Sequence, residues 1–231
     1  MRRNEYISVL VYVPAIPYPP RVHERTWASL MAMDCPARVE IVVGREDLNA
    51  MPSRIDHNIN LTGKYQRARQ MALSGGYDAL LTVEADMVVP PLALERLSRI
   101  EADVAYGLYC SRHGSHQWLA YVEMDERKGS SLTDAPEVAR AAWGQAIATD
   151  GVGLGCTLIW RRVLEAVPFR LDHPDLHAND WEFALDVKAK GFVQKHDLGV
   201  ACGHISMDVE GAPVIYWPDP DGKGMYRVES L

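Results

Sequence analysis

Two carboxylates two residues apart, Glu84 and Asp86, follow an apolar run that ends at Val83. If that run is a buried strand, at least one of the two side chains points into the crevice beyond its end, and no Lys or Arg adjoins them in the sequence. A divalent metal that bridges two phosphates would neutralise this charge, because Mg²⁺ and Mn²⁺ prefer oxygen ligands and stabilise a departing diphosphate. Solvated carboxylates or a helix cap would explain the same pair.

One histidine, His204, follows another short apolar run and comes directly after a glycine. If His204 meets the turn that carries Glu84 and Asp86, the site gains an imidazole nitrogen, and the preference moves from Mg²⁺ towards Mn²⁺. A lone histidine is also often a structural residue with satisfied hydrogen bonds. The sequence therefore predicts a metal site on the condition that residues 84–86 and 204 meet in the fold.

The segment NDWEFALDVKAKG has the pattern of a helix whose start could position a carboxylate that acts as a general base or orients a hydroxyl. Asn179 as N-cap and Glu182 three residues later would form a capping box that holds Asp180 in the first turn. Trp181 and Leu185, four residues apart, would pack this helix on the core. The helix dipole favours an ionised Asp180, as a general base requires, whereas capping alone could explain Glu182.

Two further segments offer backbone or positive charge to a ligand. The glycine-rich segment DGVGLGCT lacks the order of a dinucleotide fingerprint, so Gly153 either brings the backbone close to a sugar or phosphate or forms a plain turn. Lys64, Arg67 and Arg69 lie on or near one predicted helix and could contact a base or phosphate or form a solvated face.

A competing interpretation is a hydrolytic zinc site at His173 and His177, which have Asp residues nearby. Histidines four residues apart would need a helix to share a metal, but Pro174 lies between them, and the sequence has no HExxH motif. We expect these histidines to lie in a loop on the acceptor side of the site.

Alternating strands and helices must position these residues. Apolar runs predict buried strands over residues 7–13, 39–44 and 79–83. Helical spacing predicts one helix along which Trp27, Leu30 and Met31 recur, a second within residues 63–76 and a third after Pro91. This alternation predicts a parallel sheet whose ligand site lies off the carboxyl ends of its strands.

The pattern loosens after Val104, where we expect a small antiparallel flap or a loop before residue 136. Regular signals return within residues 151–169, as a glycine-rich turn, an apolar segment and a short helix. The last stretch, residues 206–231, is rich in Pro, Gly and Asp and predicts a segment that wraps the surface or forms a tail.

The composition is that of a folded, acidic protein. With 231 residues, 48% of them hydrophobic, the chain is long enough for one large domain with a buried core. Its net charge of −7 gives no electrostatic footprint for nucleic acid. The run before Pro14 is too brief and broken for a signal peptide or membrane span, so we expect a cytoplasmic protein.

In this order, the segments resemble the GT-A glycosyltransferases, in particular the inverting family 2 enzymes. The resemblance covers residues 7–205 and rests on a first strand ending in VPA and on ALLTVEADMVVPP, GLGCTLIWRRVLEAVPF, NDWEFALDVKAKGF and GVACGHI. It implies the GT-A fold, a Rossmann-like α/β architecture with a mainly parallel sheet flanked by helices. It also implies a single catalytic domain over 1–205, with a nucleotide-binding half at 1–89, an acceptor half at 90–205 and a tail at 206–231.

The resemblance also implies roles for single residues. EAD stands where the family has its DxD motif, which makes Asp86 a metal ligand and Glu84 a secondary or water-mediated one. His204 matches a late metal-binding histidine, and Asp180 matches the base that deprotonates the acceptor, with Glu182 as a second catalytic candidate. The candidate donor-binding residues are Pro14, Ala15, Glu46, Asp47, Arg67, Glu84, Ala85, Asp86 and Gly153.

The implied activity is transfer of a sugar from a UDP- or GDP-sugar to an acceptor hydroxyl, with Mn²⁺ or Mg²⁺ as cofactor and inversion at the anomeric carbon. A retaining transferase on the same fold and an inactive module that binds sugar nucleotides or glycans are the alternatives. A nucleotidyltransferase is disfavoured because PAIPYPPR is not a basic, glycine-rich phosphate loop. The sequence departs from the family pattern in having Glu84 for the first Asp and Asn179 before the base.

Overall fold

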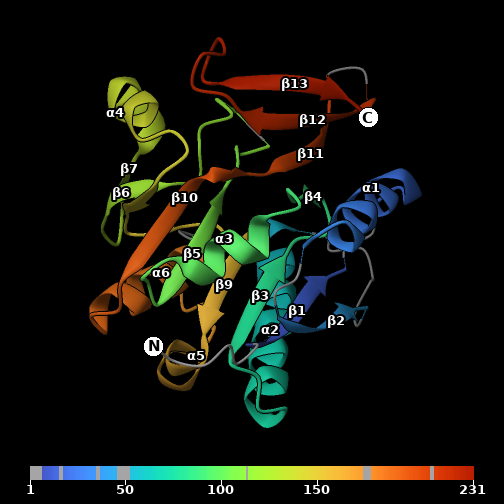
Figure 1. Ribbon diagram of the computed structural model, residues 1–231, viewed down its shortest axis with the longest axis vertical. Coiled ribbons are helices and arrows are strands. Elements are labelled where there is room, and N and C mark those ends of the chain that lie inside the picture. Colours follow the sequence, from blue (N-terminus) through green and yellow to red (C-terminus); the bar gives the residue numbers. More distant parts are fainter. Residues whose placement is uncertain are drawn as a thin grey trace.

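The structure, a computed structural model, describes residues 7–15, 18–34, 37–45, 53–112, 114–173, 178–208 and 211–231. The described part is built on a seven-stranded sheet with strand order β2-β1-β3-β9-β5-β10-β8 (Figure 1). All strands run in one direction except β9 and β8, so the predicted α/β fold with a mainly parallel sheet is confirmed. The strands are β1 (Ser8–Pro14), β2 (Arg38–Gly44), β3 (Ala79–Val83), β5 (Val104–Leu108), β8 (Ala146–Ala148), β9 (Cys156–Trp160) and β10 (Gln194–Ala201).

Helices cover both faces of this sheet. Val9 and Val11 of β1 belong to the core under α1 and α3, whereas Leu10 and Tyr12 belong to the core under α2, α5 and α6. A strand buried on both faces is apolar at nearly every position, which is why continuous apolar runs predicted β1 and β3 correctly. The helices are α1 (Pro20–Met31), α2 (Arg54–Ser74), α3 (Ala93–Arg99), α5 (Arg161–Ala166) and α6 (Asn179–Ala189).

A second, antiparallel sheet lies beside the carboxyl ends of the central strands (Figure 1). Its order is β13-β12-β11-β4, so residues from the middle and the end of the chain share one sheet. The stretch 206–231, for which the sequence predicted a surface segment or tail, forms two of these strands. The strands are β4 (Met87–Val88), β11 (Gly203–Met207), β12 (Pro213–Pro218) and β13 (Tyr226–Ser230).

Two helices differ from their prediction. In α1 the buried positions are Val22, Thr26 and Leu30, while Trp27 and Met31 are 46% and 64% exposed. The predicted helix is present, but it buries a row spaced four residues apart, and only Leu30 of the three residues whose spacing predicted it is buried. Helix α2 begins at Arg54, well before the predicted start, because Ser53 caps it and accepts a hydrogen bond from the backbone N–H of Asp56.

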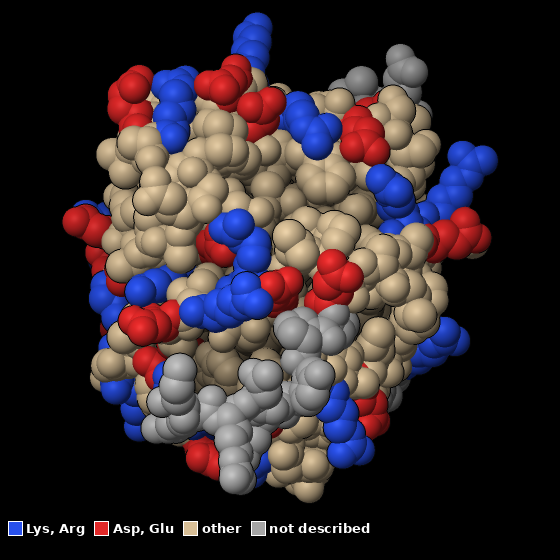
Figure 2. Space-filling model, viewed as in Figure 1, with Lys and Arg blue, Asp and Glu red and all other residues tan. Residues whose placement is uncertain are grey.

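The predicted flap is present as a two-stranded hairpin, β6 (Tyr121–Met124) and β7 (Gly129–Ser131). It leads into a 3₁₀ turn (Leu132–Asp134) and α4 (Pro136–Ala141). Figure 2 shows Lys and Arg side chains mixed with Asp and Glu on the face viewed. Among the described residues, no helix has the length and apolar character needed to cross a bilayer.

His196 fastens the strand that leads to the second sheet. Its Nε2 donates to the carbonyl of Leu119, its Nδ1 accepts from the Thr149 hydroxyl, and its ring stacks on Tyr106 at 4.7 Å. These contacts hold a neutral ring inside the core, and burial lowers the pKa of His196 to about 3.

We therefore predict acid sensitivity that originates at His196. Between the lowered pKa and about 6.5 the unfolded chain binds one more proton than the folded protein, so stability falls as pH falls. The expected loss is about 2 kcal/mol between pH 6.5 and pH 5. Urea denaturation of His196→Gln across this range should show lower stability at pH 7.5 and a flatter pH dependence. Parallel curves for both proteins would assign the acid sensitivity elsewhere.

Candidate active site

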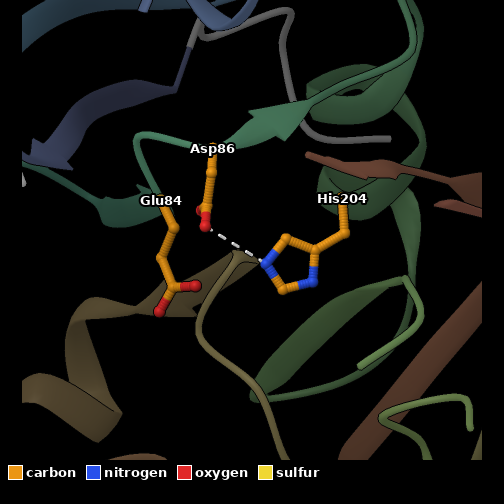
Figure 3. A group of neighbouring side chains, drawn as sticks. All are labelled: Glu84, Asp86 and His204. Carbon is orange, nitrogen blue, oxygen red and sulfur yellow. Dashed lines mark ion pairs between the residues drawn. The ribbon is translucent and has the colours of Figure 1, made fainter. Parts of the chain in front are cut away.

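The pairing of β4 with β11 brings the predicted metal ligands together. Asp86 lies one residue before β4, and Met87 pairs with His204. The backbone N–H of Ile205 also donates to the carbonyl of Asp86 at 2.8 Å. His204 Nε2 consequently lies 3.3 Å from Asp86 Oδ2, as Figure 3 shows. Residues 86 and 204 therefore meet in the fold, as the predicted metal site requires.

Glu84 completes the acidic cluster, which we define as Glu84, Asp86 and His204. One ligand atom from each lies within 4.8 Å of the others. The Tyr65 hydroxyl donates to Glu84 Oε1 at 3.0 Å. Removal from water, reinforced by the charge of Asp86, raises the pKa of Glu84 to about 7. A cation in the cluster would oppose both effects and favour ionised Glu84.

The hydrogen bonds of His204 leave its ligand atom free. Its Nδ1 lies 2.7 Å from the carbonyl oxygen of Cys110, so Nδ1 carries the proton and donates it. In the neutral ring Nε2 then presents a lone pair towards the carboxylate of Asp86, whereas in the protonated ring it would donate to that carboxylate. Two lone pairs this close require a proton or a metal between them.

Two buried atoms in the cluster have no hydrogen-bond partner within the described part of the chain, Asp86 Oδ1 and His204 Nε2. Asp86 is 0% exposed and His204 is 4% exposed, so water does not satisfy them from the surface. Because buried polar atoms are nearly always paired, both are suited to a ligand. Carboxylate oxygens with one imidazole nitrogen fit a divalent cation such as Mn²⁺.

Arg112 and Tyr18 contact the cluster, and the sequence analysis identified neither. Arg112 Nη1 lies 2.5 Å from Asp86 Oδ2, the Tyr18 hydroxyl donates to the same oxygen at 2.6 Å, and Arg112 contacts the Tyr18 hydroxyl. No Lys or Arg adjoins Glu84 and Asp86 in the sequence, but in the fold Arg112, from the loop after β5, neutralises Asp86. The signal in the sequence was a basic residue at the end of the apolar run AYGLYCSR, which was not predicted to be a strand.

Asp180 lies in the same cavity as the cluster. This cavity of about 360 Å³, which we call the acid cavity, is lined by Glu84, His204 and Asp180 among others. The backbone N–H of Trp181 donates to Asp180 Oδ1 at 2.8 Å. The pKa of Asp180 is nevertheless raised, because removal from water outweighs the backbone hydrogen bonds and the charge of Arg54. Burial therefore opposes the ionised form of Asp180 that the helix dipole was expected to favour.

The predicted capping box is absent. The N-cap of α6 is Ala178, and no side chain caps it. Glu182 instead accepts hydrogen bonds from the backbone N–H groups of Asp172 and His173, each at 2.8 Å, and lies 3.5 Å from Arg170. These contacts hold the loop before α6, and Glu182 lines a separate groove of about 1060 Å³. Trp181 and Leu185 are only partly buried, and Phe183 packs α6 on the core.

Two donor-binding candidates, Ala15 and Ala85, line a neighbouring cavity of about 550 Å³, which we call the apolar cavity. Ala15 follows Pro14 at the end of β1 and lines this cavity with Ala85, Val43 and residues of α1. The Thr26 hydroxyl fixes the backbone of this wall by donating to the carbonyl of Ala85 at 2.9 Å. Glu46 and Asp47 lie outside the described residues, as does His177 of the alternative zinc site.

Lys64 and Arg69 of α2 were expected to be solvated or to bind ligand, but both make structural contacts with backbone carbonyls. Lys64 Nζ donates to the carbonyl of Ala15 at 2.6 Å, and Arg69 Nε donates to the carbonyl of Leu164 at 2.6 Å. Arg67 is partly buried and lines neither of the two cavities. Lys64 thereby positions the end of β1 beside the apolar cavity.

Gly153 has a packing role in the structure. Its φ of +93° suits glycine, and a Cβ there would lie 2.2 Å from the Tyr109 hydroxyl. That hydroxyl accepts a hydrogen bond from the backbone N–H of Gly155 at 3.0 Å. The glycine-rich turn therefore packs on Tyr109, whose ring meets the His204 ring edge-on at 5.4 Å.

Comparison with known proteins bears on the fold. No family model matches the sequence, and no curated protein sequence matches it. Among solved structures, A197 from STIV is similar, with 15% identity, a TM-score of 0.58 and coverage of 97% of this chain and 95% of that chain. GalNAc-T7 with UDP, GalNAc and Mn²⁺ is also similar, with 12% identity, a TM-score of 0.52 and coverage of 87% of this chain and 44% of that one. At these identities the likeness shows the fold alone, and it confirms the predicted GT-A fold.

Proposed function

We propose that the protein is a metal-dependent glycosyltransferase that moves a sugar from a nucleoside diphosphate to an acceptor hydroxyl. The observation that carries this proposal is the acid cavity, where Glu84 and His204 of the acidic cluster face the same space as Asp180. The cavity lies off the carboxyl ends of β3 and β5, where open α/β sheets bind ligands. A structural neighbour with UDP, GalNAc and Mn²⁺ supports this choice.

In this proposal Asp86 and His204 hold the metal ion, and Glu84 is a third or water-mediated ligand. The unpartnered Asp86 Oδ1 and His204 Nε2 favour this assignment. Mn²⁺ fits the mixed oxygen and nitrogen ligands better than Mg²⁺. When bound, the ion would stabilise negative charge on the departing diphosphate.

We place the nucleoside in the apolar cavity, next to the cluster. Ala85 lines this cavity directly before Asp86, so a ligand that spans both would put its base against apolar walls and its diphosphate at the cluster. Pro14 and Ala15 form the end of β1 at this point. Glu46 or Asp47, after β2, is the proposed acidic contact for the nucleoside, and we assign no donor contact to Arg67 or Gly153.

Asp180 is the proposed general base. Its raised pKa makes the ionised carboxylate a better proton acceptor, as long as the working pH keeps it ionised. A base on the face opposite the leaving group gives an inverted product. NMR of the product's anomeric proton would show retention if the retaining alternative held. Nucleotide binding without transfer or donor hydrolysis would favour the inactive binding module.

We predict that Asp180→Asn and Asp86→Asn fail in different ways. Asp180→Asn should lower transfer by about 10²-fold or more and leave Mn²⁺-dependent UDP binding unchanged, because it removes only the base. Asp86→Asn should weaken Mn²⁺-dependent binding as well. Calorimetry with UDP and a transfer assay would measure both, and Asp221→Asn, whose side chain is 89% exposed, is the matched control. Normal transfer by Asp180→Asn would sink its role as base.

We predict a second effect at Arg112, whose side chain neutralises Asp86 in the absence of metal. Arg112→Ala should lower stability by about 3 kcal/mol in EDTA, because it removes the cationic partner of a buried carboxylate. Added Mn²⁺ should then stabilise this variant more than the wild type, since the ion supplies the missing charge. Chemical denaturation with and without Mn²⁺ measures both effects.

Arg99→Ala is the control for this experiment, because Arg99 pairs with Glu95 on an exposed helix face. Its effect should stay small and independent of Mn²⁺. Equal stabilisation of Arg112→Ala and wild type by Mn²⁺ would contradict a cation site at Asp86.

A further inference from the structure

Two buried amides line the acid cavity without a role in the mechanism above. Asn58 of α2 is 5% exposed and Asn179 of α6 is 2% exposed, and both line this cavity. The amide nitrogen of each has no hydrogen-bond partner in the described ranges. Such a donor is disfavoured by about 1–3 kcal/mol when it stays unpaired, so two in one cavity indicate donors kept for a ligand.

The two amides come from neighbouring helices, α2 and α6, and line the same cavity. Helices α2 and α6 pack against each other. Asn179 is the first residue of α6, and Asn58 lies near the start of α2. The amino-terminal ends of helices carry partial positive charge, which favours oxygen acceptors on the ligand. The α6 end has no side-chain cap at its N-cap residue.

The other walls restrict the charge of the ligand. The carboxylates of Glu84 and Asp180 line the same cavity. Two cations line the cavity as well, but Arg112 is paired with Asp86 and the charge of Arg54 acts on Asp180. A ligand carboxylate would therefore meet like charges, whereas hydroxyl groups can accept from the amides and donate to the carboxylates.

We propose that the acid cavity holds the transferred sugar, that Asn58 and Asn179 donate hydrogen bonds to its hydroxyl oxygens, and that the site selects an uncharged sugar over a uronic acid. This inference rests on the proposed function and adds the class of sugar and the residues that recognise it. The cavity volume of about 360 Å³ lies at the lower end of ligand sites, as a single sugar ring would require.

The test replaces each amide by an apolar side chain of similar size, in Asn58→Leu and Asn179→Leu. Calorimetry with Mn²⁺ first measures the affinity of the wild type for UDP, UDP-glucose, UDP-galactose and UDP-N-acetylglucosamine. The variants are then measured with UDP and with the UDP-sugar that binds the wild type most tightly. We expect each variant to bind UDP as tightly as the wild type does. Its affinity for the UDP-sugar, divided by its affinity for UDP, should be about fivefold lower than in the wild type. UDP-glucuronic acid should bind the wild type more weakly than UDP-glucose.

Stability without ligand separates recognition from a structural role. Removing an unpaired buried donor should leave the urea midpoint of the metal-free protein unchanged or raise it, whereas a structural amide would lower it. Asn60→Leu is the matched control, because Asn60 lies on the same helix and does not line the acid cavity. It should leave the affinity ratio unchanged.

Either of two results would overturn this inference alone: an unchanged affinity ratio in both variants, or binding of UDP-glucuronic acid as tight as that of UDP-glucose. Absence of Mn²⁺-dependent UDP binding by the wild type would overturn the proposed function and this inference together. The two failures are therefore distinguishable.

Discussion

The site depends on one short piece of antiparallel pairing, that of β4 with β11. This pairing places the carboxylate of Asp86 against the imidazole of His204, although the two residues are 118 positions apart in the sequence. Both side chains are buried, and Nε2 of His204 faces the carboxylate. Such an arrangement is stable only with positive charge beside it, which Arg112 supplies in part.

The sequence was informative where a single element determined the outcome. Strands β1 and β3 were predictable because burial on both faces requires apolar residues throughout. The carboxyl ends of parallel strands meet at one edge, so the place of Glu84 and Asp86 followed from β3 alone. The contact with His204 was reached through the family resemblance, since nothing local in GVACGHI specifies its partner.

The errors occurred where tertiary contacts overrode a local pattern. Asn179 and Glu182 have the spacing of a capping box, but the Glu182 carboxylate instead accepts hydrogen bonds from two backbone N–H groups of the preceding loop. The contacts of Arg112 and Tyr18 with Asp86 join loops from separate elements, which no spacing rule connects. The C-terminal strands β12 and β13 were not predicted, because they are short and lie among Pro, Gly and Asp residues, which are typical of turns.

Those C-terminal strands determine how rigidly His204 is held. Strand β12 pairs with β11 along its length, and His204 lies opposite Tyr216. At Gly203 an added Cβ would lie 2.5 Å from Ile215, so β12 packs directly over the residue that precedes the ligand. A ligand on an edge strand would be free to shift, whereas β11 lies between β4 and β12 and is paired on both sides. The segment beyond residue 205 therefore supports the candidate site, because without it the strand that presents His204 would be an exposed edge.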